Sequence, residues 1–277
     1  MSLFITSLNS GSNGNCYYIG NEKEAVLIDA GISCRETEKR MTRLGLSMSH
    51  VRAIFVSHEH IDHITGIPGI SKKYQLPVYI TKNTLQSASV PIEKHLVHLF
   101  KAHQPIAIGG LSVAAFLKSH DAIDPHSFIV SGNDVTIGIF TDIGFPCQQI
   151  IDHFTKCHAV FLEANYCEDM LNKGNYPYYL KKRISSDNGH LSNAQALELF
   201  MKHKGKQLTH LILSHLSKNN NCPDLVSRLF NENAGDTKVI VASRYGETPL
   251  FCIEKGKFVA ENSDNKLSKP VQQLSLF

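Results

Sequence analysis

The segment Ser-His-Glu-His-Ile-Asp-His at residues 57–63 constrains this chain more than any other feature. It gathers three imidazoles, those of His58, His60 and His63, and the carboxylate of Asp62 directly after a short apolar stretch. His58 and His60 point to the same side of an extended backbone, and a helix-starting turn would direct Asp62 and His63 elsewhere. Imidazole and carboxylate are ligands that divalent metals such as Zn²⁺ favour. The segment therefore predicts two adjacent metal sites.

Four side chains from one loop cannot complete two catalytic metal sites, so further ligands must come from elsewhere in the chain. Three candidates, His120, Asp142 and His215, each follow an apolar stretch that is typical of a strand. Strand ends are where α/β proteins commonly assemble their sites. His126 is an alternative to His120 for the third histidine position, and we favour His120.

Short strands outnumber helices in both halves of the sequence. The expected strands are residues 3–6, 17–19, 25–28, 53–56, 77–80, 96–99, 111–118, 127–130, 135–140, 159–162, 208–214 and 238–242, with a closing hairpin at 250–254 and 257–260. The expected helices are residues 33–46, 146–154, 194–203 and 223–233. This alternation predicts an α/β domain with two packed sheets and helices outside them. We place the catalytic domain at residues 1–260 and a polar, flexible tail at 261–277.

The composition indicates in which cellular compartment the protein is expected. Seven cysteines are scattered along the chain without a CxxC pair, which favours thiols in a reducing cytoplasm over a disulfide framework. No stretch approaches the roughly 20 apolar residues of a membrane span, and the N-terminus lacks the features of a signal peptide. We therefore expect a cytoplasmic protein with no membrane partner. A net charge of +3 does not by itself indicate a nucleic-acid partner.

The spacing of these residues resembles the metallo-β-lactamase superfamily, whose HxHxDH motif matches residues 58–63 in full. The resemblance implies an αββα sandwich and two divalent metal ions, Zn²⁺ or Mn²⁺, with Fe possible. It also implies a role for each matching residue: His58, His60 and His120 would bind one metal, Asp62, His63 and His215 the other, Asp142 would bridge them, and Asp29 would orient the ligand loop.

The charge of this ligand set favours one class of substrate. Five neutral histidines and two aspartates offset only half of the +4 charge of two dications. The remaining positive field suits an anionic phosphodiester better than a neutral lactam. In addition, Gly189-His190-Leu191-Ser192 is similar to the histidine motif of ribonuclease Z-like phosphodiesterases. That resemblance makes His190 a catalytic residue, together with Asp62 and Asp142, and implies that it contacts the phosphate and protonates the leaving oxygen.

Within the superfamily the chain most resembles the YycJ/WalJ-type bacterial DNA exonucleases, which implies a 5′-to-3′ nuclease acting in DNA repair. The shared segments include residues 11–15, 119–122, 162–165 and 213–217. Tyr166-Cys167 departs from the His-Asp expected there. We expect Asn165 and Asn220 to line the site, and DNA to be the substrate, with RNA as an alternative. The competing functions are a small-molecule or cyclic-nucleotide phosphodiesterase, another hydrolase on this fold, or a non-catalytic adapter.

The last five residues form a separate signal: Gln273, Leu274, Ser275, Leu276 and Phe277. They resemble the pentapeptide with which bacterial proteins bind the DNA sliding clamp. A polar segment would present their apolar side chains to a hydrophobic groove. We therefore expect the clamp to be a partner.

Overall fold

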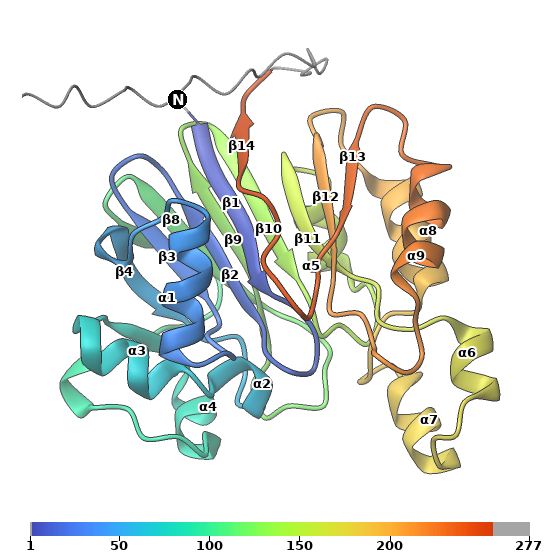
Figure 1. Cartoon of the computed structure of the whole chain (residues 1–277), viewed down its shortest axis with the longest axis horizontal. Helices are drawn as coiled ribbons and strands as arrows, with labels where there is room; N and C mark the ends of the chain where they lie inside the picture. Colours follow the sequence, from blue (N-terminus) through green and yellow to red (C-terminus); the bar gives the residue numbers. More distant parts are fainter. Residues whose placement is uncertain (1, 257–277) are drawn as a thin grey trace, which may run out of the picture.

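The computed structural model describes residues 2–256, which form a four-layered αββα sandwich (Figure 1). The predicted fold class is confirmed. The second arm of the expected hairpin at 257–260, the tail at 261–277 and the clamp-like residues Gln273, Leu274, Ser275, Leu276 and Phe277 lie outside the described residues. Between residues 2 and 256 no helix has the length and hydrophobicity of a membrane span.

Two seven-stranded sheets form the middle of the sandwich. In spatial order, the first sheet contains β14 (Phe251–Glu254), β1 (Ser2–Asn9), β2 (Cys16–Gly20), β3 (Ala25–Ile28), β4 (Val51–Phe55), β5 (Val78–Ile80) and β6 (Val97–Leu99). The second contains β13 (Lys238–Val241), β12 (His210–Ser214), β11 (Ala159–Glu163), β10 (Val135–Phe140), β9 (His126–Gly132), β8 (Leu111–Leu117) and β7 (Ile106–Ile108). β14 pairs with β1 antiparallel, with Leu3 opposite Ile253.

The helices cover the outer faces of both sheets. The helices near the first sheet are α1 (Cys34–Arg43), α2 (Ile61–Ile64), α3 (Ile67–Tyr74) and α4 (Lys82–Ser87), with 3₁₀ turns η1 (Met48–His50) and η2 (Lys94–Leu96). Those near the second sheet are α5 (Gln148–Phe154), α6 (Glu168–Lys173), α7 (Tyr178–Ile184), α8 (Asn193–His203) and α9 (Pro223–Asn231). The sequence analysis assigned no helix to α2, α3, α4, α6 or α7, all of them at most eight residues long.

From Ala53 onward β4 is buried on both faces, which explains why residues 53–56 form an unbroken apolar run, whereas Arg52 near the start of the strand is exposed. Ala53 and Phe55 point into the core between the sheets, whereas Ile54 and the following Val56 pack in the cluster beneath the outer helices. A strand that is buried on both faces has no position for a polar side chain. The polar and metal-ligating residues of this segment therefore begin only where the strand ends, at Ser57.

The strands that end near the site run in the same direction. β3 and β4 are parallel neighbours in the first sheet, and β10, β11 and β12 are parallel neighbours in the second. β8 shares the direction of β10, because both pair antiparallel with β9. The carboxyl ends of these strands meet at one end of the sandwich, where α2, α6 and α7 also lie (lower part of Figure 1).

A candidate dinuclear metal centre

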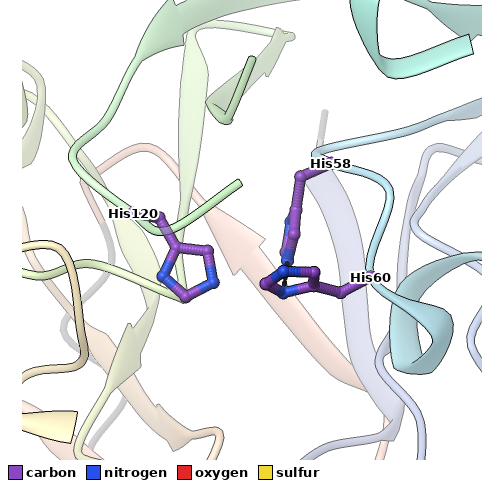
Figure 2. A group of neighbouring side chains, drawn as sticks. All are labelled: His58, His60 and His120. Carbon is purple, nitrogen blue, oxygen red and sulfur yellow. Dashed lines mark hydrogen bonds between the residues drawn. The ribbon is translucent and has the colours of Figure 1, made fainter. Parts of the chain in front are cut away.

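Three histidines from two different sheets form the first ligand group. His58 and His60 follow β4, and His120 follows β8. Their candidate ligand nitrogens lie within 4.8 Å of one another, and Figure 2 shows the three rings directed toward one another. Although His60 is the N-cap residue of α2, its side chain makes no capping hydrogen bond, and its Nδ1 lies 3.1 Å from Nε2 of His58. The geometry therefore brings together the three residues predicted for one metal.

A second group, Asp62, His63 and His215, also gathers ligand atoms within 4.8 Å. Nε2 of His215 lies 3.5 Å from Oδ2 of Asp62. Asp142 lies between the two groups, with Oδ1 3.4 Å from Nε2 of His215 and 3.8 Å from Nε2 of His120. This is the position that a bridging carboxylate requires.

The hydrogen bonding of the candidate ligands gives independent support for metal binding. Nε2 of His120 and Nε2 of His215 are both buried, and within residues 2–256 neither has a hydrogen-bond partner. An unpaired buried polar atom costs roughly 1–3 kcal/mol. Coordination of a cation would satisfy both nitrogens, so their lack of a hydrogen-bond partner beside the carboxylates of Asp62 and Asp142 supports metal binding at this position.

Hydrogen bonds on the opposite ring nitrogens fix these imidazoles. Nδ1 of His63 donates to Oδ2 of Asp29 at 2.7 Å, and Asp29 also accepts from the backbone N–H and the hydroxyl of Ser57. Nδ1 of His120 donates to the carbonyl of Gly189 at 3.1 Å, and Nδ1 of His215 donates to Oε1 of a buried glutamate, Glu163, at 2.9 Å. Such partners set the tautomer, so that Nε2 carries the lone pair that a metal needs. Asp29 thus contacts His63 and the start of the ligand loop, and its role in orienting that loop stays a prediction.

Three of these residues adopt left-handed backbone conformations. Asp29, Asp142 and His215, which follow β3, β10 and β12, have φ values of 58°, 55° and 56°. Such conformations are uncommon for residues other than glycine. Each costs about 1–3 kcal/mol and persists only where the surrounding structure holds it in place. Each strand therefore ends in a sharp turn that directs its last polar side chain toward the centre.

Burial and the neighbouring carboxylates shift the pKa values of the histidines in the site. Burial holds the pKa of His58 well below its usual range and lowers that of His120 to about 3, so both rings are neutral. Burial also disfavours protonation of His63, but Asp142 and Asp29 raise its pKa to about 10. Without a metal, His63 therefore carries a proton that a cation would displace.

Glu163 is a functional residue that the sequence analysis missed. It is fully buried, and its Oε1 accepts a 2.8 Å hydrogen bond from Nδ1 of His190 as well as the bond from His215. Burial alone would raise its pKa, but His190 and the other donors lower it to about 2. The available signal was its place at the end of β11, one residue before the position level with Asp142, which follows the neighbouring strand β10.

His190 completes the site beside His120 and His215. Its ring centroid lies 5.1 Å from that of His120 and 5.2 Å from that of His215, and its side chain is 20% exposed. Glu163 binds Nδ1, so that Nε2 is the nitrogen left for a substrate. The backbone N–H of His190 donates to the carbonyl of Ile184 at 2.9 Å, and this hydrogen bond holds the segment before His190 in place.

Asn15 is a second residue that the sequence analysis did not assign. Its Nδ2 lies 3.2 Å from Oδ2 of Asp62 and 3.1 Å from Nε2 of His63. Its Oδ1 accepts from the backbone N–H of Gly11 and from the hydroxyl of Tyr17. The loop between β1 and β2 thereby contacts the ligand loop. A lone asparagine in a turn-rich segment carries no pattern that predicts this contact.

The structure gives a different result for each of the three remaining candidates, His126, Asn165 and Asn220. His126 begins β9, contacts the carbonyl of Asp124 and packs against Phe100, and it is in none of the groups of candidate metal ligands among the described residues. Asn165 lies at the site, where its Nδ2 donates to the carbonyl of His215 at 2.8 Å. Asn220 is buried with its amide 3.4 Å from Ser217, and its predicted role in lining the site stays a prediction.

Comparison with known proteins agrees with this geometry. The family model described as beta-lactamase superfamily domain matches residues 24–215. The chain is similar to exodeoxyribonuclease YycJ of Bacillus anthracis, with 32% identity over 230 residues that cover 81% of this chain and 86% of the relative. It is similar to exodeoxyribonuclease WalJ of Streptococcus pneumoniae, with 30% identity over 256 residues that cover 88% and 95%. The metallo-beta-lactamase fold protein YhfI of Bacillus subtilis superposes with a TM-score of 0.70 at 15% identity, covering 91% of this chain and all of that one.

Proposed function

The chain belongs to the beta-lactamase superfamily, and from its site we propose that the protein is a metal-dependent phosphodiesterase that acts as a DNA exonuclease. The observation that carries the proposal is the contact of Glu163 with His190 beside two groups of metal-ligating side chains. Support for DNA as the substrate comes from the names of the YycJ and WalJ relatives, which the chain matches over most of their length.

The ligand assignment is part of the proposal. His58, His60 and His120 would hold one divalent cation, Asp62, His63 and His215 the other, and Asp142 both. We propose Zn²⁺ or Mn²⁺, with Fe as an alternative that the same donors accept. When bound, such cations supply Lewis acidity that activates water near neutral pH and neutralises phosphate charge.

The chain's own residues would complete the reaction. As the bond from phosphorus to the leaving oxygen breaks, His190 donates the proton on Nε2 to that oxygen. Glu163 stabilises the protonated imidazole, because its carboxylate accepts from Nδ1 at 2.8 Å. A positioned general acid of this kind contributes a factor of roughly 10²–10⁴ in rate. The ligands Asp62 and Asp142 add two negative charges, and the carboxylates of Asp29 and Glu163 beside the ligand imidazoles add two more, one of which the protonated His190 offsets. With two dications bound, the net charge of these groups would therefore be only slightly positive, which still favours an anionic strand.

The test is a nuclease assay on single- and double-stranded DNA labelled at either end, with Zn²⁺, Mn²⁺ or Fe²⁺ added. Loss of nucleotides from the 5′ end is expected. Asp142→Ala should lose both metal and activity, whereas His190→Ala should keep metal and lose rate. Degradation of DNA by both variants at the wild-type rate would refute the assigned site. Activity on cyclic nucleotides or thioesters alone would favour another hydrolase of the family.

The C-terminal pentapeptide supports a second part of the proposal, recruitment to the sliding clamp. Residues 273–277 match the clamp-binding pattern and follow a polar segment with Pro270. Recruitment to replicating DNA would place the nuclease in DNA repair, in a cytoplasm where its seven free cysteines stay reduced. Removal of residues 273–277 should abolish binding to the clamp and leave hydrolysis of short oligonucleotides intact. Unchanged clamp binding by the shortened protein would contradict this part.

A further inference from the structure

Arg183 is a charged side chain near the candidate metal centre to which no role has been assigned. It is the next-to-last residue of α7, which lies at the end of the sandwich where the ligand loops meet (Figure 1). Its side chain is 58% exposed, and its guanidinium pairs through Nε with Oδ2 of Asp121. Within residues 2–256 neither of its two Nη groups makes a hydrogen bond. The ion pair therefore uses one nitrogen of the guanidinium and leaves two for a ligand.

Asp121 connects Arg183 to the first ligand group. It follows His120 in the chain, and its Oδ1 lies 3.4 Å from Nε2 of His120, the nitrogen proposed to bind a cation. This Oδ1 is buried and, in the described part of the chain, has no hydrogen-bond partner, whereas Oδ2 accepts from Arg183. One carboxylate thus separates the guanidinium from a candidate metal ligand, which places Arg183 beside the metal centre but not in it.

The chain that follows Arg183 leads directly to His190. The backbone N–H of His190 donates to the carbonyl of Ile184, the residue after Arg183, at 2.9 Å. Gly189 packs against the same turn so closely that a Cβ there would lie 2.3 Å from the carbonyl oxygen of Arg183. The carbonyl of Gly189 in turn accepts from Nδ1 of His120 at 3.1 Å. These contacts fix the position of Arg183 relative to the groups that would cleave the substrate.

The chemistry of the guanidinium indicates what it could bind. An exposed ion pair contributes little to stability, because water screens the charges and two long side chains must be ordered. Stability alone therefore does not explain the pair of Arg183 with Asp121. The two Nη groups of an arginine form a planar fork of donors that matches two oxygens of a phosphate. A nucleic-acid strand offers such a phosphate at every linkage.

We infer that Arg183 binds the phosphate next to the one that is cleaved, and that Asp121 holds the guanidinium in place for this contact. The inference rests on the proposed function and adds a residue that favours a polynucleotide over a small diester. The neighbouring phosphate is the partner because the carboxylate of Asp121 lies between the guanidinium and Nε2 of His120. A diester that contains a single phosphate gains nothing from Arg183.

Steady-state kinetics of Arg183→Gln test this distinction. On end-labelled DNA the variant should raise KM roughly tenfold, the loss expected for a hydrogen bond to a charged group. The kcat should stay within about twofold of wild type, since the contact is the same in the ground state and the transition state. On bis(4-nitrophenyl) phosphate, which has one phosphate, the variant should match wild type in both parameters. This second substrate also reports that the variant is folded and that its metal centre is intact.

Two further variants separate charge from geometry. Arg183→Lys keeps the charge but loses the fork of donors, so its KM on DNA should lie between those of wild type and Arg183→Gln. The matched control is Arg43→Gln, because Arg43 is 46% exposed and pairs through one nitrogen with Glu247 at 2.8 Å. Arg43→Gln should behave as wild type on both substrates.

A scan of the strand locates the contacted phosphate. We suggest fluorescence anisotropy with DNA whose linkages are phosphorothioate to prevent turnover, one linkage at a time being replaced by an uncharged methylphosphonate. At the contacted linkage this replacement should weaken binding to wild type roughly tenfold and leave binding to Arg183→Gln unchanged. At every other linkage the effects of the two changes should multiply. Arg183→Gln should also reduce the slope of log affinity against log salt by about 0.7–0.9.

Three results would overturn the inference: equal KM of wild type and Arg183→Gln on DNA, an equal loss of activity on bis(4-nitrophenyl) phosphate, or effects that multiply at every linkage of the scan. Failure of the proposed function is distinguishable. In that case wild type would hydrolyse no DNA with any added metal, and the anisotropy scan, which needs no turnover, would still decide whether Arg183 contacts a phosphate.

Discussion

Replacement of Glu163 by glutamine tests how the site uses its buried carboxylate. Glu163 accepts hydrogen bonds from five donors: Nδ1 of His190 at 2.8 Å, Nδ1 of His215 at 2.9 Å, Nδ2 of Asn165 at 3.5 Å, and the backbone N–H groups of Ile143 at 2.7 Å and Leu191 at 3.3 Å. A glutamine preserves the shape but loses the charge, and its NH₂ group can only donate. The imidazole contacts are therefore weakened or lost, whereas a backbone contact can be kept.

The size of the effect follows from the two imidazoles. Without the carboxylate, His190 loses the group that stabilises its protonated form, so kcat should fall by roughly 10²–10⁴-fold. His215 loses the partner that fixes its tautomer, and metal affinity should fall by roughly 10–100-fold. At saturating metal the loss of kcat should remain, because the two effects act through different histidines.

The assay combines kcat on end-labelled single-stranded DNA with metal affinity from competition against a chromophoric chelator. Glu168→Gln is the matched control, since Glu168 is an exposed carboxylate five residues away that accepts one hydrogen bond from Ser192. Glu168→Gln should behave as wild type. The reasoning fails if Glu163→Gln retains kcat within about threefold of wild type once metal is saturating.

Three further perturbations address the surrounding structure. Asp29→Asn should weaken metal binding roughly 10–100-fold, because Asp29 fixes His63 through Nδ1; wild-type affinity in chelator competition would contradict this role. Gly144→Ala should reduce kcat and destabilise the fold by about 1–3 kcal/mol in urea unfolding, since the added Cβ would lie 1.8 Å from the carbonyl oxygen of Asp187, whereas Gly246→Ala has open space and should be neutral. The metal-free protein should lose stability as pH rises from about 6.5 to about 10, because the raised pKa of His63 stabilises the fold only while the ring is protonated. Urea unfolding in EDTA across this range measures the effect, and rising stability would contradict it.

The strands with regular apolar patterns could be predicted from the sequence. β3 and β10 begin and end where the sequence analysis placed them, since turn residues flank a continuous buried run. The short helices α2, α6 and α7 could not, because their positions depend on contacts with other parts of the chain. α7 has no buried residue and therefore no apolar face to predict it.

In the site, too, some residues could be predicted from the sequence and others could not. His58, His60, Asp62 and His63 are close in sequence, and their spacing alone indicated metal chemistry. Glu163 could not be predicted in the same way, since its function arises from two histidines 27 and 52 residues away in the chain. Only the parallel pairing of β10, β11 and β12 brings these residues to one edge.

Each candidate ligand group takes residues from both sheets, His58 and His60 with His120 in one, Asp62 and His63 with His215 in the other. A bound cation would therefore fasten the two halves of the sandwich together at this end. Inter-sheet contacts behind the ligands, such as Tyr17 against Phe161 at 4.9 Å, help to set the distance between them, and the Tyr17 hydroxyl also reaches Asn15 beside Asp62 and His63. A substitution in that core would alter coordination without touching a ligand, and removal of the metal would remove this link while the core between the sheets still holds the two halves together.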